Sequence, residues 1–265
     1  IATKTGSTTV EGFWKDLETS LNNLKTDYID IYQFHNPSFC PKPGDGTGLY
    51  EAMLEAKAQG KIHFIGLTNH RLPVAIEACE SGLYDTIQFP FSYLADQKDI
   101  DLVNRCKENN IGFICMKALS GGLINRSDAA YAYLAQFDNV LLIWGIQKES
   151  ELDEFISYQT KAPELTQEIQ DLIAHDRKEL AGDFCRGCGY CMPCPKGIQI
   201  NQCARMSLML RRAPAASWLN DHWQAEMKKI EECLNCGKCK QHCPYHLNTP
   251  ELLKKNYEDY KTFLK

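Results

Sequence analysis

The sequence predicts an α/β protein of parallel strands, followed by a mostly helical, cysteine-rich region. Two observations support this prediction. Over the first 160 residues, short β-rich runs alternate with amphipathic helical segments. Such alternation implies parallel strands joined by right-handed crossovers. In addition, nine of the 13 cysteines lie between Cys185 and Cys243, which sets the second part of the chain apart.

Six strand–helix units are expected in the first part. The predicted strands are Ile1–Lys4, Tyr28–His35, Ile62–Thr68, Thr86–Pro90, Gly112–Met116 and Val140–Trp144. Helical spacing of apolar residues covers residues 10–24, 49–60, 72–81, 99–109 and 127–137. Six units fit an open doubly wound sheet or part of a closed (β/α)₈ barrel, and the pattern alone does not distinguish between these two folds. The lack of a Gly-x-Gly-x-x-Gly motif after an early strand weakens the dinucleotide-binding open sheet.

The predicted domain boundary lies at Pro163, which is expected to be the first residue of a helix over Glu164–Leu180. The two predicted domains are therefore residues 1–162 and residues 163–265. In the second domain, residues 181–183 lead into the cysteines. Helical stretches are expected near residues 200–212 and 217–232, and a last helix is expected from Pro250.

Eight of the nine clustered cysteines form two runs with the spacing of iron–sulfur ligands. The second run has the C-x₂-C-x₂-C-x₃-C-P spacing of bacterial ferredoxins, at Cys233, Cys236, Cys239 and Cys243. The first run has only two residues before its fourth cysteine, and consists of Cys185, Cys188, Cys191 and Cys194. Zinc favours two separated pairs of ligands, and disulfides need an oxidising compartment that nothing here indicates. We therefore predict two [4Fe–4S] clusters in a ferredoxin-like domain.

The ligands are expected to follow the crossed pattern of two-cluster ferredoxins, in which the fourth cysteine of each run binds the other cluster. The predicted ligands of one cluster are Cys185, Cys188, Cys191 and Cys243. Those of the other cluster are Cys233, Cys236, Cys239 and Cys194. The shortened first run leaves Cys203 as an alternative fourth ligand, and otherwise Cys203 is a buried thiol. Three glycines are expected to let the backbone approach the clusters: Gly187, Gly189 and Gly237.

Composition and charge exclude several classes of protein. A hydrophobic content of 44% and a charged content of 24% are ordinary for a globular protein. The sequence has no apolar run of 18 or more residues and no signal-peptide pattern, so no membrane partner is expected. The net charge of −5 divides into −10 for residues 1–180 and +5 for residues 181–265. The basic excess is expected to offset the negative clusters, and no motif for binding nucleic acid accompanies it.

Two strands of the first part resemble the catalytic strands of the aldo/keto reductase family. Residues 27–37, Asp-Tyr-Ile-Asp-Ile-Tyr-Gln-Phe-His-Asn-Pro, resemble the strand that ends in the active-site histidine, here His35. Ile1-Ala-Thr-Lys4 resembles the preceding strand, which ends in the active-site lysine. The family also uses an aspartate and a proton-donating tyrosine that lie before the lysine strand. We therefore expect this sequence to be a fragment that lacks two βα units upstream of Ile1.

Further motifs resemble the cofactor-binding segments of the same family. Residues 61–69 resemble the strand whose Ser/Thr–Asn pair holds the nicotinamide carboxamide, and a glutamine on the next strand shares this role. Residues 115–122 resemble a turn over the cofactor, and residues 145–151 resemble a segment that contacts the adenosine phosphate. The resemblance thus implies that the cofactor, NADP or NAD, is bound by Thr68, Asn69, Gln88, Met116, Lys148 and Glu151.

Taken over almost the whole chain, the resemblance is closest to aldo/keto reductases that carry a C-terminal double [4Fe–4S] domain. It implies a (β/α)₈ barrel, and the candidate residues do fall at strand C-terminal ends, where barrel active sites lie. Ordinary structural roles remain open to single residues. Lys4 alone is a chain-end lysine, His35 alone is a satisfied structural histidine, and Thr68-Asn69 alone is a helix cap.

The expected function is that of a nicotinamide-dependent oxidoreductase acting on a carbonyl or alcohol group. In this hypothesis His35 orients the carbonyl oxygen and Lys4 lowers the pKa of the tyrosine. Because a [4Fe–4S] cluster passes one electron at a time, a second hypothesis is an electron-transfer module or subunit that serves a ferredoxin or another redox protein. In this hypothesis the barrel has lost or altered the reductase chemistry. A third is that the clusters are structural. The oxygen sensitivity of such clusters favours a cytoplasmic protein of anaerobic surroundings.

Overall fold

The computed structural model describes residues 1–180, 184–212 and 214–264 and divides into two compact units. The first unit comprises Ile1–Phe91, Ala95–Met116 and Leu134–Trp144. The second comprises Ser92–Leu94, Lys117–Tyr133 and Gly145–Lys265. The predicted boundary at Pro163 stays a prediction, and the predicted link at residues 181–183 lies outside the described residues.

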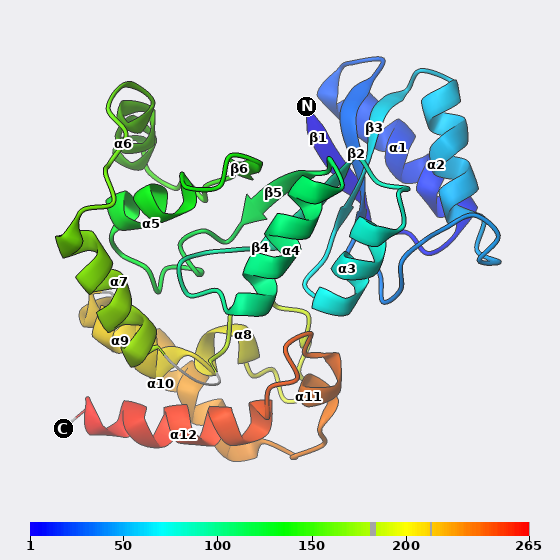
Figure 1. The fold of residues 1–265 in the computed structure, drawn as a ribbon. Coiled ribbons are helices and arrows are strands. Elements are labelled where there is room, and N and C mark those ends of the chain that lie inside the picture. Colours follow the sequence, from blue (N-terminus) through cyan, green and yellow to red (C-terminus); the bar gives the residue numbers. More distant parts are fainter. Residues whose placement is uncertain (181–183, 213, 265) are drawn as a thin grey trace. The chain divides into compact units, whose positions relative to one another are not determined.

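The first unit is built on a six-stranded sheet in which all neighbouring strands are parallel and follow one another in chain order (Figure 1). The strands are β1 (Ala2–Thr5), β2 (Ile29–His35), β3 (Ile62–Thr68), β4 (Thr86–Pro90), β5 (Gly112–Met116) and β6 (Val140–Leu142). Doubly wound sheets reverse their strand order at a switch point, whereas a barrel sheet does not. The barrel fold class is thus confirmed, with six βα units in this chain.

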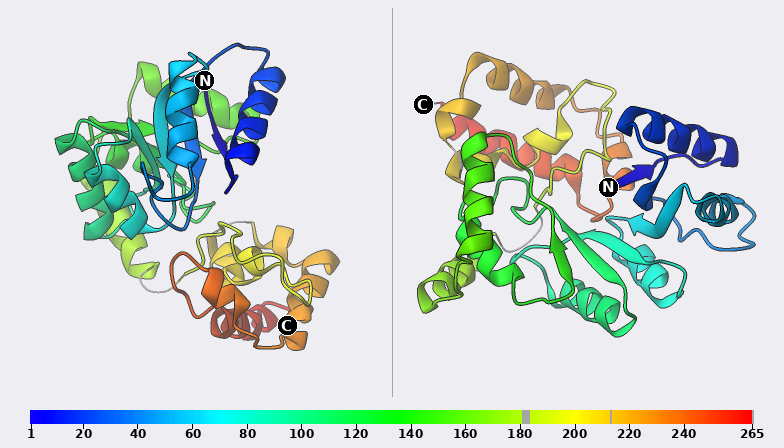
Figure 2. Two further views of the ribbon diagram at one scale, coloured as in Figure 1. Left: turned by 90° about the vertical axis from the view of Figure 1, so that its right-hand side faces the viewer. Right: turned by 90° about the horizontal axis from the view of Figure 1, so that it is seen from above.

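Helices cover one face of this sheet, as both views in Figure 2 show. They are α1 (Val10–Leu24), α2 (Leu49–Ala58), α3 (Leu72–Glu80) and α4 (Gln97–Glu108). The α1 helix begins after Thr9, whose hydroxyl accepts a hydrogen bond from the Gly12 N–H at 3.1 Å. Its buried face carries Phe13, whose ring packs edge-on against Tyr32 of β2 with centroids 5.7 Å apart.

The register of the strands places polar residues of neighbouring strands on one face. Lys4 pairs with Gln33, His35 pairs with Thr68, and Thr68 pairs with Gln88. Successive side chains of a strand point to opposite faces, and Tyr32 of β2 faces the helices. The polar residues therefore lie on the face away from the helices, which is the interior face of a barrel.

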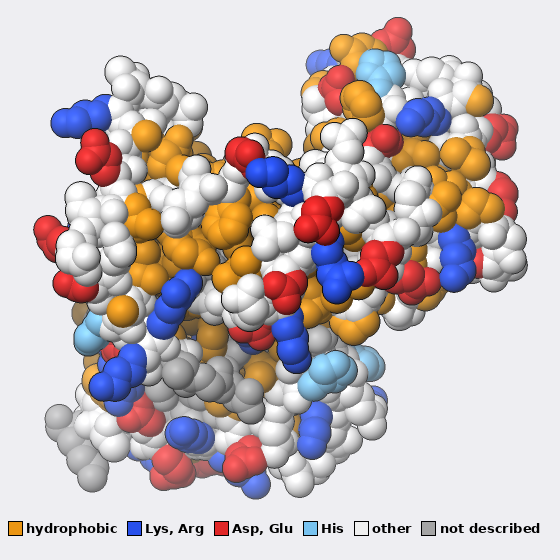
Figure 3. All heavy atoms as spheres, in the orientation of Figure 1, with side chains coloured by type: hydrophobic (Ala, Val, Ile, Leu, Met, Phe, Trp, Pro, Cys, Tyr) orange, Lys and Arg blue, Asp and Glu red, His pale blue; other side chains and the backbone are white. Residues whose placement is uncertain are grey.

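Apolar side chains on the interior face remain exposed in this chain. Phe64 of β3 is 50% exposed and Leu141 of β6 is 61% exposed. Figure 3 shows hydrophobic side chains, in orange, reaching the surface among charged ones on the face that it draws. Among the described residues, β1 and β6 each have one hydrogen-bonded neighbour, so the sheet is open at both edges.

Gly66 of β3 leaves room for a side chain that crosses the interior face. A Cβ atom at Gly66 would lie 2.5 Å from Thr86 Oγ1 and 2.8 Å from Gln33 Cγ. Through this space the Gln33 amide donates a hydrogen bond from Nε2 to Gln88 Oε1 at 3.1 Å. Both side chains are buried. The missing side chain of Gly66 therefore allows Gln33 to hold Gln88 in place.

The second unit is mostly helical. Its α-helices are α5 (Ser127–Leu134), α6 (Glu149–Thr160), α7 (Gln167–Glu179), α8 (Ile200–Cys203), α9 (Met206–Arg212), α10 (Asp221–Lys228), α11 (Lys238–His242) and α12 (Thr249–Thr262). Two short 3₁₀ helices are η1 (Ala215–Trp218) and η2 (Lys229–Glu232). In the part of the chain that the structure describes, no helix has the length and apolar character that a membrane crossing needs.

Two helix predictions for the second unit are corrected by the structure. The α7 helix begins at Gln167 and not at Pro163, because the Thr166 hydroxyl accepts a hydrogen bond from the Ile169 N–H and caps the first turn. The stretch predicted over residues 200–212 is broken between α8 and α9. Asn256 of α12 occupies the break, where it accepts from the Ser207 N–H at 2.8 Å and donates to the Ala204 carbonyl at 3.1 Å.

A buried ionic network joins four segments of the second unit that are far apart in the sequence. Arg212 of α9 contacts Asp176 at 2.8 Å and Glu179 at 2.6 Å, both on α7, and its Nε donates to the Leu123 carbonyl. The Tyr93 hydroxyl donates to the same Asp176 carboxylate. The Asp176 side chain is only 3% exposed, so Arg212 supplies the countercharge that its burial requires.

We predict that Gly66→Ala destabilises the first unit by about 1–3 kcal/mol, because the added methyl group overpacks the space used by Gln33. Urea unfolding under nitrogen, followed by circular dichroism, measures this change. Gly6→Ala is the matched control, since no atom lies within 4 Å of its added Cβ. Equal stability of the two variants would contradict the prediction.

Candidate functional site

The first cysteine cavity lies in the second unit and encloses about 330 Å³, with space open to solvent included. Its sulfur-bearing residues are those that the spacing predicts for one cluster, Cys185, Cys188, Cys191 and Cys243. The backbone supports this grouping at Gly187, which has a φ of +66° and donates its N–H to Cys185 Sγ at 3.4 Å. A side chain at this φ would be strained, so glycine allows the tight turn.

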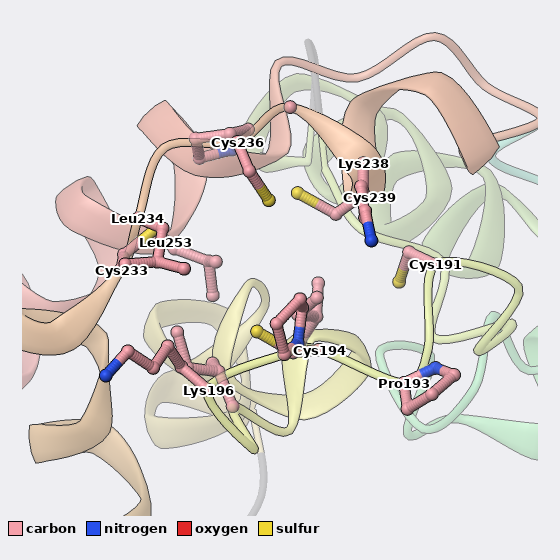
Figure 4. Close-up of a pocket in the computed structure, with 15 residues that line it drawn as sticks. Cys191, Pro193, Cys194, Lys196, Cys233, Leu234, Cys236, Lys238, Cys239 and Leu253 are labelled. Atoms are coloured by element: carbon pink, nitrogen blue, oxygen red, sulfur yellow. The ribbon is translucent and has the colours of Figure 1, made fainter.

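The second cysteine cavity encloses about 420 Å³, again with space open to solvent included. It is lined by the four cysteines predicted for the other cluster, Cys194, Cys233, Cys236 and Cys239, and Cys191 lies at its edge (Figure 4). Figure 4 shows the sulfur atoms of Cys236 and Cys239 pointing into the space above Cys194. Because Cys191 lines both cavities, the two cavities adjoin.

The short helix α11 explains how one run serves both cavities. It begins after Gly237, and Cys239 in its first turn lines the second cavity. Cys243 follows its last residue and lines the first cavity. The helical turn between these two cysteines therefore directs the fourth sulfur of the run away from the other three.

The donor set of each cavity fits a [4Fe–4S] cluster. Such clusters are held by four cysteine thiolates. The first cavity gathers four cysteines, and the second gathers four together with Cys191, which the two cavities share. Burial raises the pKa of the thiols of Cys185 and Cys188 and raises that of Cys191 to about 12. Bound iron would supply the positive charge that keeps such buried sulfurs ionised. Cys203 is fully buried and lines neither cavity.

Within the part of the chain that the structure describes, one further group could hold a metal ion by geometry alone: His175, Asp176 and Glu179 of α7. Both carboxylates, however, already contact Arg212. The arginine occupies the position that a cation would need, so we assign this group to the ionic network of the second unit.

In the first unit, side chains of three neighbouring strands meet on the interior face. Thr68 Oγ1 of β3 lies 4.0 Å from Met116 Sδ of β5, and Gln88 Nε2 of β4 lies 3.5 Å from the same sulfur. Thr68 and Gln88 are buried. A thioether is a weak acceptor, so the Thr68 hydroxyl and the Gln88 N–H groups keep most of their hydrogen-bonding capacity for a polar ligand, whereas Gln88 Oε1 already accepts from Gln33. This donor set fits a carboxamide.

The Asn69 side chain makes two hydrogen bonds within the loop after β3 and one to the loop after β2. Its Oδ1 accepts from the backbone N–H groups of His70 at 2.9 Å and Arg71 at 2.8 Å. Its Nδ2 donates to the Pro37 carbonyl at 2.9 Å. One N–H of the amide is left for a further partner. The predicted contact of Asn69 with the cofactor stays a prediction.

His35 and Lys4 lie at the C-terminal ends of β2 and β1, and both are exposed. Partial burial of the ring lowers the pKa of His35, and the positive charge of Lys4 lowers it further. With a pKa below the usual 6.5, the imidazole is neutral at pH 7 and gains its proton only in more acidic solution.

Lys148 and Glu151 belong to the second unit, at the start of α6. The Glu151 carboxylate accepts from the Gln147 N–H at 2.8 Å and from the Lys148 N–H at 3.3 Å. These bonds satisfy backbone donors that a helix start leaves open. In this structure Glu151 therefore caps α6, and the predicted phosphate contact of the two residues remains a prediction.

Two residues near the candidate sites were not singled out from the sequence. One sequence pattern could have indicated Gln33, which holds Gln88: it is a polar residue at an interior position of β2, between apolar neighbours. Arg205 packs behind the Cys185–Cys188 loop and carried no local signal, because its burial depends on distant parts of the second unit.

A parallel barrel sheet with polar residues at its strand ends, combined with two four-cysteine cavities, defines a barrel protein of the iron–sulfur class. Comparison with protein families agrees. The aldo/keto reductase family model matches residues 1–140, and a 4Fe–4S dicluster domain matches residues 184–248. The chain belongs to the aldo/keto reductase family and carries a C-terminal 4Fe–4S dicluster domain.

Curated relatives support the family assignment. Methylglyoxal reductase DkgB of Salmonella typhimurium is 31% identical over 181 residues, which cover 64% of this chain and 65% of the relative. The NADH-specific methylglyoxal reductase of Escherichia coli is 31% identical over 114 residues, or 43% of this chain and 35% of the relative. The chain thus spans less than two thirds of these relatives.

Solved structures share the fold. Aldo-keto reductase AKR11C1 from Bacillus halodurans, in its holo form, matches with a TM-score of 0.55 and 20% identity over 66% of this chain and 70% of that one. The thermostable aldo-keto reductase Tm1743 matches with a TM-score of 0.51 and 20% identity over 66% of this chain and 69% of that one.

The crossed arrangement of cysteines can be tested with paired substitutions. Cys185→Ser with Cys243→Ser removes two ligands from one cavity, so this double variant should keep one cluster. Cys185→Ser with Cys194→Ser removes one ligand from each cavity and should lose both clusters. Iron and sulfide analysis of protein purified under nitrogen measures the outcome.

Local ligation, with each run holding its own cluster, predicts the opposite pair of results. The two double variants would then exchange their iron contents. Cys203→Ser serves as the control, because Cys203 lines neither cavity and its loss should leave both clusters in place.

We also predict that Lys4→Met raises the pKa of His35, although not to its ordinary value, because burial is the larger cause of the lowered pKa. Titration of the histidine ring by NMR measures the change. Lys15→Met is the control, since Lys15 is not among the groups that shift His35. A pKa of His35 that stays unchanged in Lys4→Met would show that the two side chains do not interact.

Proposed function

We propose that this chain is part of a nicotinamide-dependent oxidoreductase that interconverts a carbonyl compound and its alcohol, with two [4Fe–4S] clusters that transfer electrons. The observation that carries the proposal is the set of Lys4, His35, Thr68, Gln88 and Met116. All five lie at or near the C-terminal ends of consecutive strands β1 to β5, and the register places the first four on the interior face. Active sites of barrel enzymes lie at this end of the strands.

Thr68, Gln88 and Met116 would hold the nicotinamide. The Thr68 hydroxyl and the Gln88 amide offer donors and acceptors to its carboxamide, and Gln33 fixes the direction of the Gln88 side chain. The Met116 thioether offers a soft, polarizable surface to the ring. When bound, the reduced nicotinamide supplies a hydride.

His35 and Lys4 would act on the substrate side. The neutral His35 ring can donate an N–H to the carbonyl oxygen without placing a second full charge beside Lys4. Lys4 would lower the pKa of the family's proton-donating tyrosine through its own positive charge. Residues 1–265 contain no residue that the resemblance matches to this tyrosine, so turnover is proposed for the whole protein.

The relatives favour a small carbonyl substrate. Two of those named above are methylglyoxal reductases, one of them NADH-specific. We extend to this protein the class of small aldehydes and ketones, and either NAD or NADP as cofactor. Lys148, at the start of α6, is the proposed contact of the adenosine phosphate, together with Glu151.

A second candidate function is electron exchange with a ferredoxin or another redox protein through the second cluster. The specific observation is the exposure of this cavity, since Cys236 is exposed and Leu234 beside it is 61% exposed. Lys196 and Lys238 line it, are exposed, and would attract an acidic partner. In this case the barrel site would serve as the other end of the electron path.

We predict that Lys4→Met lowers turnover of methylglyoxal by roughly 10²-fold or more in the full-length protein, because the tyrosine then loses the charge that makes it an effective acid. NAD(P)H consumption measures turnover, and circular dichroism checks the fold. Lys15→Met should behave as the unsubstituted protein. Undiminished turnover in Lys4→Met would remove Lys4 from the mechanism.

The same preparation separates the two candidate functions. Under nitrogen, bleaching of the visible cluster absorption by NAD(P)H would connect the clusters to the nicotinamide site. Bleaching by a reduced ferredoxin, with no turnover of any carbonyl compound, would favour the electron-transfer function. Clusters that neither donor reduces would be assigned a structural role.

A further inference from the structure

Arg205, between α8 and α9, is a buried arginine beside the first cysteine cavity. It is 7% exposed. Its Nη1 lies only 2.7 Å from the position that a Cβ atom at Gly187 would occupy, within the Cys185–Cys188 loop. Its Nη2 donates to the Gly121 carbonyl at 2.5 Å. The guanidinium is thus packed between this loop and the segment that contains Gly121.

Among residues 1–180, 184–212 and 214–264, no carboxylate oxygen lies within 4.0 Å of a side-chain nitrogen of Arg205. Within the same residues, its buried Nε has no hydrogen-bond partner. Arginine stays protonated in proteins, and a buried charge needs a countercharge nearby. By contrast, Arg212 of the same unit contacts two carboxylates.

The Arg205 guanidinium packs against Gly187, whose backbone N–H donates to Cys185 Sγ at 3.4 Å. Its positive charge therefore lies beside the loop that carries two of the predicted ligands of the first cluster, Cys185 and Cys188. Four thiolates around a [4Fe–4S] core give it a net negative charge, which increases by one unit on reduction. Net charge and nearby charges are among the properties that set the potential of such a cluster.

The second cavity has a different electrostatic environment. Its nearest basic side chains, Lys196 and Lys238, are exposed, and Lys196 also contacts Glu232 at 3.4 Å. Charges in contact with water are screened much more strongly than buried ones. The buried Arg205 therefore acts on the first cavity more strongly than the exposed lysines act on the second.

We propose that Arg205 is the built-in counter-ion of the first cluster and raises its reduction potential above that of the second cluster. This inference rests on the proposal that both cavities hold [4Fe–4S] clusters. Its consequence is a direction for electron flow, because an electron that enters at the exposed second cluster would pass to the first. Arg205 thus acts through its effect on the potential of the cluster, and binds no substrate.

The test is a redox titration of Arg205→Gln under nitrogen, followed by EPR. Reduction of the higher-potential cluster should become at least tenfold less favourable, which is ~59 mV for a one-electron couple. The lower-potential step should stay where it is. Arg205→Lys keeps the positive charge and should retain the potential of the unsubstituted protein. Lys196→Gln is the control for an exposed charge and should move neither step.

Several results would overturn the proposal. One is an unchanged reduction potential of the higher-potential cluster in Arg205→Gln with full iron content. Another is an equal fall of this potential in the Gln and Lys variants, which would assign the effect to packing. If Arg205→Gln holds only one cluster, Arg205→Lys becomes the deciding variant. Reduction that is tenfold less favourable in Arg205→Lys would contradict the role of the positive charge, and a retained potential would support that role. Absence of iron from the unsubstituted protein would instead refute the proposed cluster content itself.

Discussion

Each cysteine cavity is completed by a sulfur from the other run, and much of the second unit follows from this requirement. Cys194 and Cys233 must face the same cavity although a long stretch of chain separates them. That stretch folds into short helices that pack against α12, and the core between them is apolar. The break between α8 and α9 is bridged by the Asn256 side chain, which pairs with the backbone there. The helices between the two runs therefore return the second run to the first.

In the first unit, the corresponding constraint is the parallel register. Because neighbouring strands start at matched positions, a residue at the end of one strand meets a residue of the same face on the next. This brings Thr68, Gln88 and Met116 into contact although they are 20 or more residues apart. Gly66 shows how narrow the tolerance is, since one methyl group there would collide with two neighbouring side chains.

The sequence was most informative where the signal is local. The strands Ile62–Thr68, Thr86–Pro90 and Gly112–Met116 were predicted to the residue, because glycine, proline or polar residues flank a short apolar run. The start of α7 was missed because proline at a first helical turn and threonine at a cap are competing signals. The break at residues 204–205 was missed because it depends on Asn256, which is remote in the sequence.

The residues of the candidate sites also differ in how far local sequence patterns predict them. The two sets of four cysteines could be proposed from spacing, since ligand geometry restricts the intervals between them. The strand-end residues needed a resemblance to a family before they could be connected. The burial of Arg205 and the support of Gln88 by Gln33 depend on three-dimensional packing, which no local pattern carries.

The network around Arg212 also bears on how far this protein is modular. Tyr93 and Leu123 come from segments between strands of the barrel sheet, yet both contact the ionic groups of α7 and α9. A shortened chain that ends after α7 would keep Asp176 and lose Arg212. Removing one partner of a buried ion pair costs about 3–5 kcal/mol. A chain shortened in this way would therefore need a new residue to neutralise Asp176.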